Sequence, residues 1–115
     1  MSDKFGEAVI NDLKMWIERN LHMKLNINDV AAHSGYSKFY IQRLFRKVTG
    51  ESIARHIRER KLEHARRDLE SSNLSVLEIA HKYGFDTQQL FTRVFKKRFS
   101  IPPASYRQCH LKDIL

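Results

Sequence analysis

The chain repeats one short pattern, and this repeat limits the folds that it can adopt. Residues 29–36 (DVAAHSGY) match residues 78–85 (EIAHKYGF) at an offset of 49. The segments RLFRK at 43–47 and RVFKK at 93–97 then match at an offset of 50, so one residue is added between the two matches. A duplication of this kind predicts two copies of one supersecondary unit.

Hydrophobic periodicity predicts that both copies are helical. Apolar residues recur at intervals of three and four, and only four Gly and two Pro interrupt the chain. We therefore expect an all-α fold of about seven helices, resembling two homeodomain-like helix-turn-helix subdomains joined by a long central helix. The expected helices are Glu7–Leu21, one from Asn26 or Asn28 to Gly35, one opened by Ser37, Ser52–Ser71, one from Ser75 to Gly84, one from Asp86 to Phe99, and a short one over Ala104–His110.

In each copy a small Ala precedes a Gly by four residues. The small side chain allows a second helix to cross closely, and the Gly permits the sharp turn between the two helices. These turn and packing positions are Ala31 with Gly35, and Ala80 with Gly84. A residue that can cap a helix follows each turn, and we expect Ser37 and Asp86 to cap the second helix of each pair.

The second helix of each pair presents a polar face opposite an apolar one. Arg can donate two hydrogen bonds to guanine, Gln can pair with adenine, and Lys can neutralise phosphate. In the first copy this face carries Lys38, Phe39, Gln42, Arg43 and Arg46. In the second copy it carries Gln88, Gln89, Thr92, Arg93 and Lys96, with Lys97 as a candidate phosphate contact. Repetition of such a face predicts sequence-specific binding of double-stranded DNA.

Charge and composition agree with this interpretation and restrict the alternatives. The formal net charge of +8 favours a polyanionic partner, which could be DNA, RNA or an anionic membrane. No apolar run is long enough to span a membrane, and the N-terminus lacks a signal-peptide stretch, so we expect a cytoplasmic protein. Cys109 is the single cysteine, which excludes an internal disulfide.

Several other functions fit the sequence less well. There is no Gly-rich phosphate loop and no paired nucleophile and base, so we expect no enzymatic activity. The six His show no metal-ligand spacing, and we expect no metal and no cofactor. The first helix is amphipathic, but its polar face is not strongly basic, which disfavours a membrane-surface role. The aromatic residues near the second copy could stack on bases, but their helical spacing favours a core role. The main alternative is a non-specific architectural protein for DNA or RNA.

Longer motifs are similar to the DNA-binding domain of the AraC/XylS family of bacterial regulators. They are GYSKFYIQRLF at 35–45, TGES at 49–52, IRERKL at 57–62, YGFDTQQ at 83–89, PP at 102–103 and YR at 106–107. The resemblance covers nearly the whole chain, and the small stand-alone activators of the MarA, SoxS and Rob type are the most similar members. Relatives usually carry Trp at the position of Phe39, often His at that of Tyr40, a small hydroxyl residue at that of Leu90, and Gly at that of Ser100.

The resemblance implies an organisation and a mode of action. It implies an N-terminal subdomain over residues 1–51, a linker helix over 52–71 and a C-terminal subdomain over 72–115. It implies binding as a monomer, with the two recognition helices in successive major grooves, and activation through RNA polymerase at stress-defence and multidrug-resistance promoters, in the bacterial cytoplasm at the nucleoid. It adds Tyr40 and Leu90 to the DNA-contacting positions.

Overall fold

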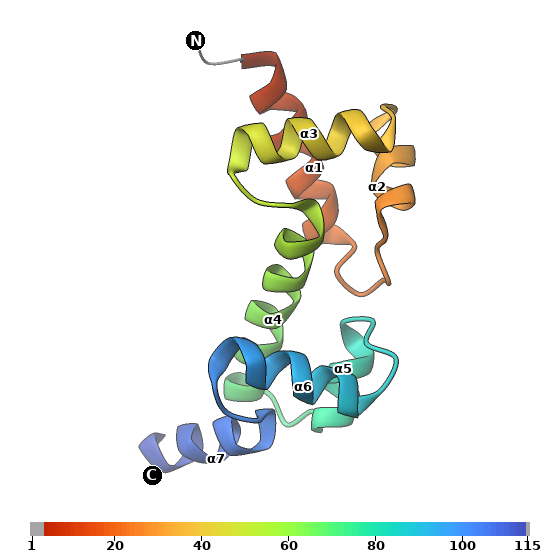
Figure 1. Cartoon of the computed structure of the whole chain (residues 1–115). Coiled ribbons are helices and arrows are strands. Elements are labelled where there is room, and N and C mark those ends of the chain that lie inside the picture. Colours follow the sequence, from red (N-terminus) through yellow and green to blue (C-terminus); the bar gives the residue numbers. More distant parts are fainter. Residues whose placement is uncertain (1–3, 115) are drawn as a thin grey trace. The chain divides into compact units, whose positions relative to one another are not determined.

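The computed structural model describes residues 4–114, with side chains as far as residue 111, and this part of the chain is helical without a strand (Figure 1). The helices are α1 Lys4–Arg19, α2 Ile27–Ser34, α3 Lys38–Thr49, α4 Ile53–Ser71, α5 Val76–Lys82, α6 Gln88–Phe99 and α7 Pro103–Ile114. The predicted all-α fold class is therefore confirmed. The largest differences from the expected bounds are in α1, which lies two to three residues earlier, and in α7, which continues four residues past His110.

The described residues form two compact units that divide within α4, between Arg60 and Lys61. The first unit contains α1, α2, α3 and the first half of α4. The second contains the remainder of α4 with α5, α6 and α7. Each unit thus includes one copy of the repeated pattern, and each has a core of its own.

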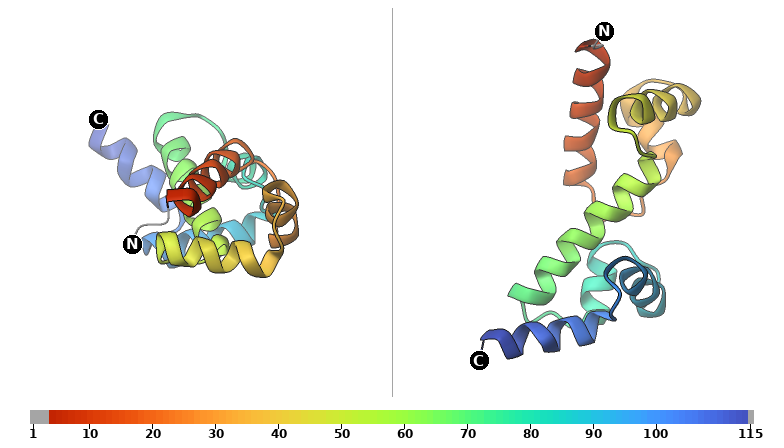
Figure 2. Two further views of the ribbon diagram at one scale, coloured as in Figure 1. Left: turned by 90° about the horizontal axis from the view of Figure 1, so that it is seen from above. Right: turned by 60° about the vertical axis from the view of Figure 1, so that its left-hand side comes forward.

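One face of each helix forms the core of the first unit. α3 contacts both α1 and α2, and the view from above in Figure 2 shows these three helices around a common centre. The buried apolar side chains are Ile10, Leu13, Ile17, Leu21, Val30, Ile41, Leu44, Phe45, Ile53 and Ile57. In α3 the buried positions recur at intervals of three and four, so the opposite side of this helix is left facing solvent.

Polar and aromatic contacts connect the helices of the first unit. The Arg60 guanidinium makes a two-point contact with the Glu18 carboxylate, with Nε to Oε2 at 3.1 Å and Nη2 to Oε1 at 2.6 Å. This bidentate pair links the first half of α4 to α1. The ring of Trp16 stacks on that of His33, with centroids 4.4 Å apart, and so links α1 to α2. Trp16 therefore packs within the first unit.

Aromatic side chains dominate the core of the second unit. The buried apolar residues are Leu62, Ala65, Leu69, Ile79, Ala80, Tyr83, Phe91 and Phe95. The Phe91 ring contacts Phe85 and Phe95, with centroids 5.1 and 5.7 Å away, and Phe95 also contacts Phe99 at 4.6 Å. These rings pack on one another, as their helical spacing predicted, and Phe91 and Phe95 have no exposed surface for base stacking.

Two side chains of α7 fasten it to the end of α4. Arg107 donates hydrogen bonds to the carbonyl oxygens of Leu69 and Ser72, at 3.1 and 3.3 Å. Leu69 lies in the last turn of α4, where carbonyl groups lack helical partners, and Ser72 directly follows the helix. The Tyr106 hydroxyl donates to the Glu70 carboxylate. The C-terminal helix thereby adds to the hydrogen bonds that Ser71 and Ser72 make to the Arg67 and Asp68 carbonyls.

One charged residue of α4 is not placed as the sequence suggested. The segment 55–67 is rich in charge, which predicts a solvated helix face with mixed ion pairs. Arg66 fits that expectation, since it pairs with Glu63 and Glu70. Lys61 does not, because its side chain is only 7% exposed and its ammonium donates to the Tyr83 carbonyl at 2.8 Å.

Candidate nucleic-acid interface

The turn between α2 and α3 is fixed by its capping residues. Asn26 caps α2 and forms a capping box with Asp29. Gly35 closes α2 in the left-handed conformation, at φ 78°, and its N–H donates to the Ala31 carbonyl at 3.0 Å. The Ser37 hydroxyl then accepts the Tyr40 N–H at 3.2 Å, which opens α3. The predicted helix-turn-helix is therefore formed in the first unit.

The second unit repeats this turn with one difference. Ser75 and Glu78 form a capping box at the start of α5, and Gly84 adopts φ 77° after the helix. The expected cap on α6 was Asp86, but the capping residue is Thr87, whose hydroxyl accepts the Leu90 N–H at 3.0 Å. The added residue of the second copy lies before the cap, so α6 begins one residue later than predicted.

The four turn and packing positions differ in burial between the copies. Ala80 is fully buried, whereas Ala31 is half-buried. Gly35 is exposed and Gly84 half-buried, and both have positive φ. A side chain at these two glycines would be strained because L residues rarely adopt this conformation. The glycines therefore act through the backbone in both turns.

Every candidate DNA-contacting residue of α3 is exposed. They are Lys38, Phe39, Tyr40, Gln42, Arg43 and Arg46. Phe39 is 67% exposed, which is unusual for a large apolar side chain, and the Lys38 ammonium lies 5.4 Å from the centre of its ring. α3 thus brings three cations, an amide and two aromatic rings to one solvent-facing surface, which we call the α3 face.

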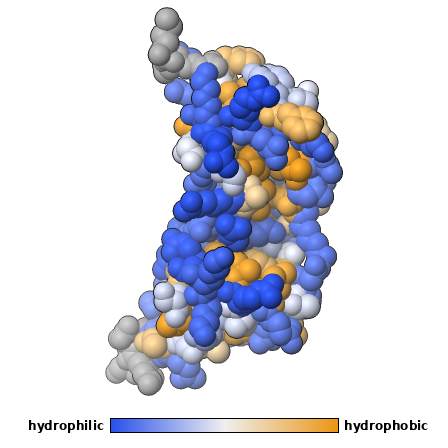
Figure 3. Space-filling model, viewed as in Figure 1, coloured by the Kyte–Doolittle hydropathy of each residue, from blue (hydrophilic) through white to orange (hydrophobic). Residues whose placement is uncertain are grey.

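The corresponding surface of α6, which we call the α6 face, varies more in the exposure of its side chains. Gln88, Gln89, Arg93, Lys96 and Lys97 are exposed, while Leu90 and Thr92 are half-buried. The buried side of α6 is anchored by Phe91 and Phe95. The helix is therefore fixed at its back while its amides and cations point to solvent. Figure 3, coloured by hydropathy, shows hydrophilic side chains around exposed hydrophobic ones on each of the two units.

Five cations of the two faces have no acidic partner among the described residues. Within residues 4–111 the structure gives no carboxylate contact to Arg43, Arg46, Arg93, Lys96 or Lys97. Elsewhere, Arg60 pairs with Glu18 and Lys82 pairs with Asp68. Unpaired cations keep their full attraction for an external polyanion such as a phosphate backbone.

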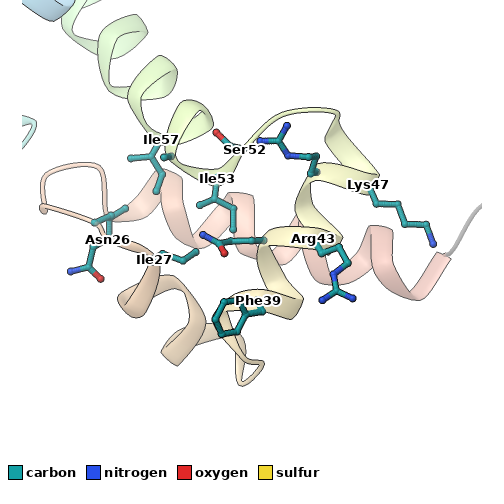
Figure 4. Close-up of a pocket in the computed structure, with 12 residues that line it drawn as sticks. Asn26, Ile27, Phe39, Arg43, Lys47, Ser52, Ile53 and Ile57 are labelled. Atoms are coloured by element: carbon teal, nitrogen blue, oxygen red, sulfur yellow. The ribbon is translucent and has the colours of Figure 1, made fainter.

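A groove beside the α3 face adds residues that the sequence did not single out. It has a volume of about 720 Å³ and lies between the segment before α2, α3 and the start of α4 (Figure 4). Lys47 lies at its edge, and Ser52 and Ile53 line the end from which α4 begins. The position of Lys47, four residues after Arg43 on the same helix, is the signal that could have identified it.

Two other features bear on the kind of site present. Among residues 4–111, no three His, Cys, Asp or Glu side chains gather in a way that could hold a metal ion. None of the described helices is both long and apolar enough to cross a bilayer.

Comparison with known proteins identifies the family. A model of a helix-turn-helix domain matches residues 30–108. The multiple antibiotic resistance protein MarA of Escherichia coli (strain K12) is 41% identical over 113 residues, covering 97% of this chain and 89% of MarA. The chain belongs to the AraC family. It is accordingly a DNA-binding transcription regulator, and double-stranded DNA is its partner.

Other members of the AraC family extend the comparison. The transposon Tn10 TetD protein of Escherichia coli is 47% identical over 111 residues, with 96% of this chain and 80% of TetD covered. The DNA-binding domain of AdpA, a global transcriptional factor solved in complex with a target DNA, superimposes with a TM-score of 0.83 at 27% identity. That match covers 87% of this chain and 90% of the AdpA chain.

Proposed function

We propose that this AraC-family protein binds specific promoter sequences as a monomer, with α3 and α6 in successive major grooves. The observation that carries the proposal is the pair of solvent-facing surfaces, each built from a capped helix with buried apolar residues behind it. Gln42 and Arg43 on α3, and Gln89 and Arg93 on α6, provide the donors and acceptors that distinguish base pairs. Lys96 and Lys97 provide charge for phosphates.

A monomer suffices because one chain already carries two recognition helices. Most helix-turn-helix proteins need a second subunit to contact two half-sites. Here the duplication supplies the second contact from the same chain, and the two copies differ in sequence. Their recognition sites should differ too, which predicts an asymmetric operator. In contrast, a dimer would favour a palindromic one.

Activation at stress-defence promoters is the second part of the proposal. AarP of Providencia stuartii, 42% identical over 104 residues, is an HTH-type transcriptional activator, and MarA is a multiple antibiotic resistance protein. By this likeness we infer that the protein recruits RNA polymerase at multidrug-resistance and stress-defence promoters. It would act where promoter DNA lies, in the bacterial cytoplasm at the nucleoid.

Selection of binding sites from random duplex DNA tests the proposal. Enrichment of one asymmetric motif about two helical turns long, bound with at least about a thousandfold preference over random duplex, is the expected result. Sedimentation of the complex should give one chain per duplex. A preference near one, together with a steep salt dependence, would instead indicate a non-specific architectural protein.

The role in activation requires its own measurement. Transcription in vitro from a promoter that carries the selected motif should increase when the protein and RNA polymerase are both present. The control is the same promoter with the motif scrambled. Unchanged or reduced transcription from the intact promoter would contradict the assignment as an activator.

A further inference from the structure

The groove beside α3 has the size and lining of a small-molecule site. Its volume of about 720 Å³ falls in the range of about 300–1,000 Å³ that is typical of ligand pockets. Its walls come from three parts of the first unit: the segment before α2, α3, and the start of α4. In Figure 4 side chains from all three surround the same hollow.

The floor of the groove is apolar. Ile53 and Ile57 of α4 line the groove and are almost fully buried, at 3% and 7% exposure. Leu25 and Ile27 are half-buried beside them. Phe39 adds an exposed ring at the edge. A molecule that fills this space gains by covering apolar surface, so its body must be apolar.

The rim of the groove is cationic. Arg43, Arg46 and Lys47 line it, and there is no Asp or Glu among the twelve lining residues shown in Figure 4. α4 begins in the groove at Ser52 and Ile53. The first-turn N–H groups of a helix have no helical carbonyl partner and favour negative charge nearby. A molecule held here must therefore carry an anionic group.

We propose that the groove binds small amphipathic anions, in which a carboxylate is attached to an aromatic or short aliphatic body, and that an occupied groove prevents α3 from binding DNA. The second half of this inference rests on the proposed function of the α3 face. Phe39, Gln42 and Arg43 belong both to the groove lining and to that face. A ligand that contacts these three side chains occupies the groups that base pairs would use.

Nuclear magnetic resonance titration of the full chain tests the site without DNA. The probes are 2-naphthoate and its neutral analogue 2-naphthamide, which have nearly the same shape. The expected result is shifts of the Ile27, Ile53 and Ile57 methyl signals with 2-naphthoate, and affinity for 2-naphthamide at least about tenfold lower. Equal affinities, shifts confined to other residues, or no shifts at millimolar probe would overturn the proposal.

A matched pair of variants distinguishes binding of the probe in the groove from its general attraction to a positively charged protein. Lys47→Gln removes a rim cation and Lys97→Gln removes an equal charge from α6, which does not line the groove. Lys47→Gln should weaken 2-naphthoate binding by about threefold to tenfold, and Lys97→Gln by less than about twofold. Equal losses in both variants would mean that the probe responds to net charge, which overturns the proposal. Circular dichroism melting confirms that each variant folds.

Competition with DNA completes the test. For simple exclusion, 2-naphthoate at nine times its Kd should raise the Kd for a specific duplex about tenfold. Ala54→Phe places a ring in the groove and should reduce this effect. Unchanged DNA affinity with the groove saturated would overturn the exclusion. Failure of the proposed function would give a different result: without any probe, the protein would bind the specific and the random duplex with equal affinity.

Discussion

The Lys61 ammonium donates a hydrogen bond to the Tyr83 carbonyl oxygen, with Nζ and O 2.8 Å apart. This contact joins the second half of α4 to the end of α5, immediately before the turn that leads to α6. Burial of the side chain, at 7% exposure, lowers the pKa of Lys61 to about 8. The Tyr83 hydroxyl donates to Asp68 at 2.6 Å, and burial raises the pKa of Tyr83. A buried cation thus holds the helix pair that positions the α6 face.

The stability of the second unit should therefore increase with pH between about 8 and 10. In this window the unfolded chain, whose lysine pKa is near 10.5, binds more protons at Lys61 than the folded chain, whose pKa is about 8. The free energy of unfolding should rise by about 2 kcal/mol across the window. This estimate uses the maximum slope for one titrating group, about 1.4 kcal/mol per pH unit. Urea denaturation at several pH values measures it.

Lys61→Met is the control for this pH dependence. The variant carries no titrating group at the site, so its stability should change little over the same window. Above pH 10 the raised pKa of Tyr83 acts in the opposite direction, because the unfolded tyrosine then loses its proton first. A rise of the same size in Lys61→Met would show that Lys61 is not its source.

Ser100 ends α6 in a conformation that suits glycine. Its φ is 73°, and it is the only residue other than Gly with positive φ among residues 4–114. Gly50 ends α3 in the same way, at φ 81°, and lies 50 residues earlier, the offset of the second matched segment. Ser100→Gly should stabilise the second unit by about 1 kcal/mol, because it removes the left-handed strain of an L residue.

The reverse change at the equivalent position provides the matched test. A Cβ built on Gly50 has no heavy atom within 4 Å, so Gly50→Ser adds no clash and changes only the backbone preference. It should destabilise the first unit by about 1 kcal/mol in urea denaturation. Effects of the same sign in both variants would contradict the backbone explanation.

The cap of α6 gives a third prediction. Thr87→Ala removes the hydroxyl that accepts the Leu90 N–H and should cost about 1 kcal/mol of stability. Ser37→Ala at the equivalent position of the first unit should cost a similar amount. Asp86→Ala should cost less than Thr87→Ala, because Asp86 is not the cap. Thermal melting measures the loss of stability in each variant. A larger loss in Asp86→Ala than in Thr87→Ala would show that Asp86 is the cap.

These residues also show how far the sequence determines the structure. The duplication and the spacing of apolar residues predicted both helix-turn-helix units and the exposed positions of Gln42, Arg43, Gln89 and Arg93, since both signals are local. The same duplication also indicates the correct cap of α6, because Ser37 aligns with Thr87 at an offset of 50. The prediction of Asp86 was wrong because it used the offset of 49, which does not include the residue inserted in the second copy.

Features that depend on distant segments were not predictable from local patterns. Lys61 lies among charged residues in the sequence, and its burial depends on Tyr83, 22 residues later. Arg107 caps α4 from a helix 35 to 38 residues away. The groove beside α3 combines three elements that are separate in sequence. In each case helical periodicity places a side chain on a face, but tertiary packing decides what that face meets.

The α3 and α6 faces predict two different responses of DNA binding to loss of a cation. Arg43→Ala should weaken binding to the selected duplex by about 1–3 kcal/mol and relax the preference at one base position, since a guanidinium can pair with guanine in a fixed geometry. Lys97→Ala should weaken binding to all duplexes equally and reduce the slope of log Kd against log salt by about one, as expected for a phosphate contact.

Fluorescence anisotropy with the selected and a scrambled duplex, at several salt concentrations, distinguishes the two responses. Arg19→Ala is the charge control, because Arg19 is an exposed cation at the end of α1 that belongs to neither face. It should change both affinities by less than about twofold. Equal losses for Arg43→Ala on the two duplexes would make Arg43 a phosphate contact. Base recognition by the first unit would then have to come from the other residues of the α3 face.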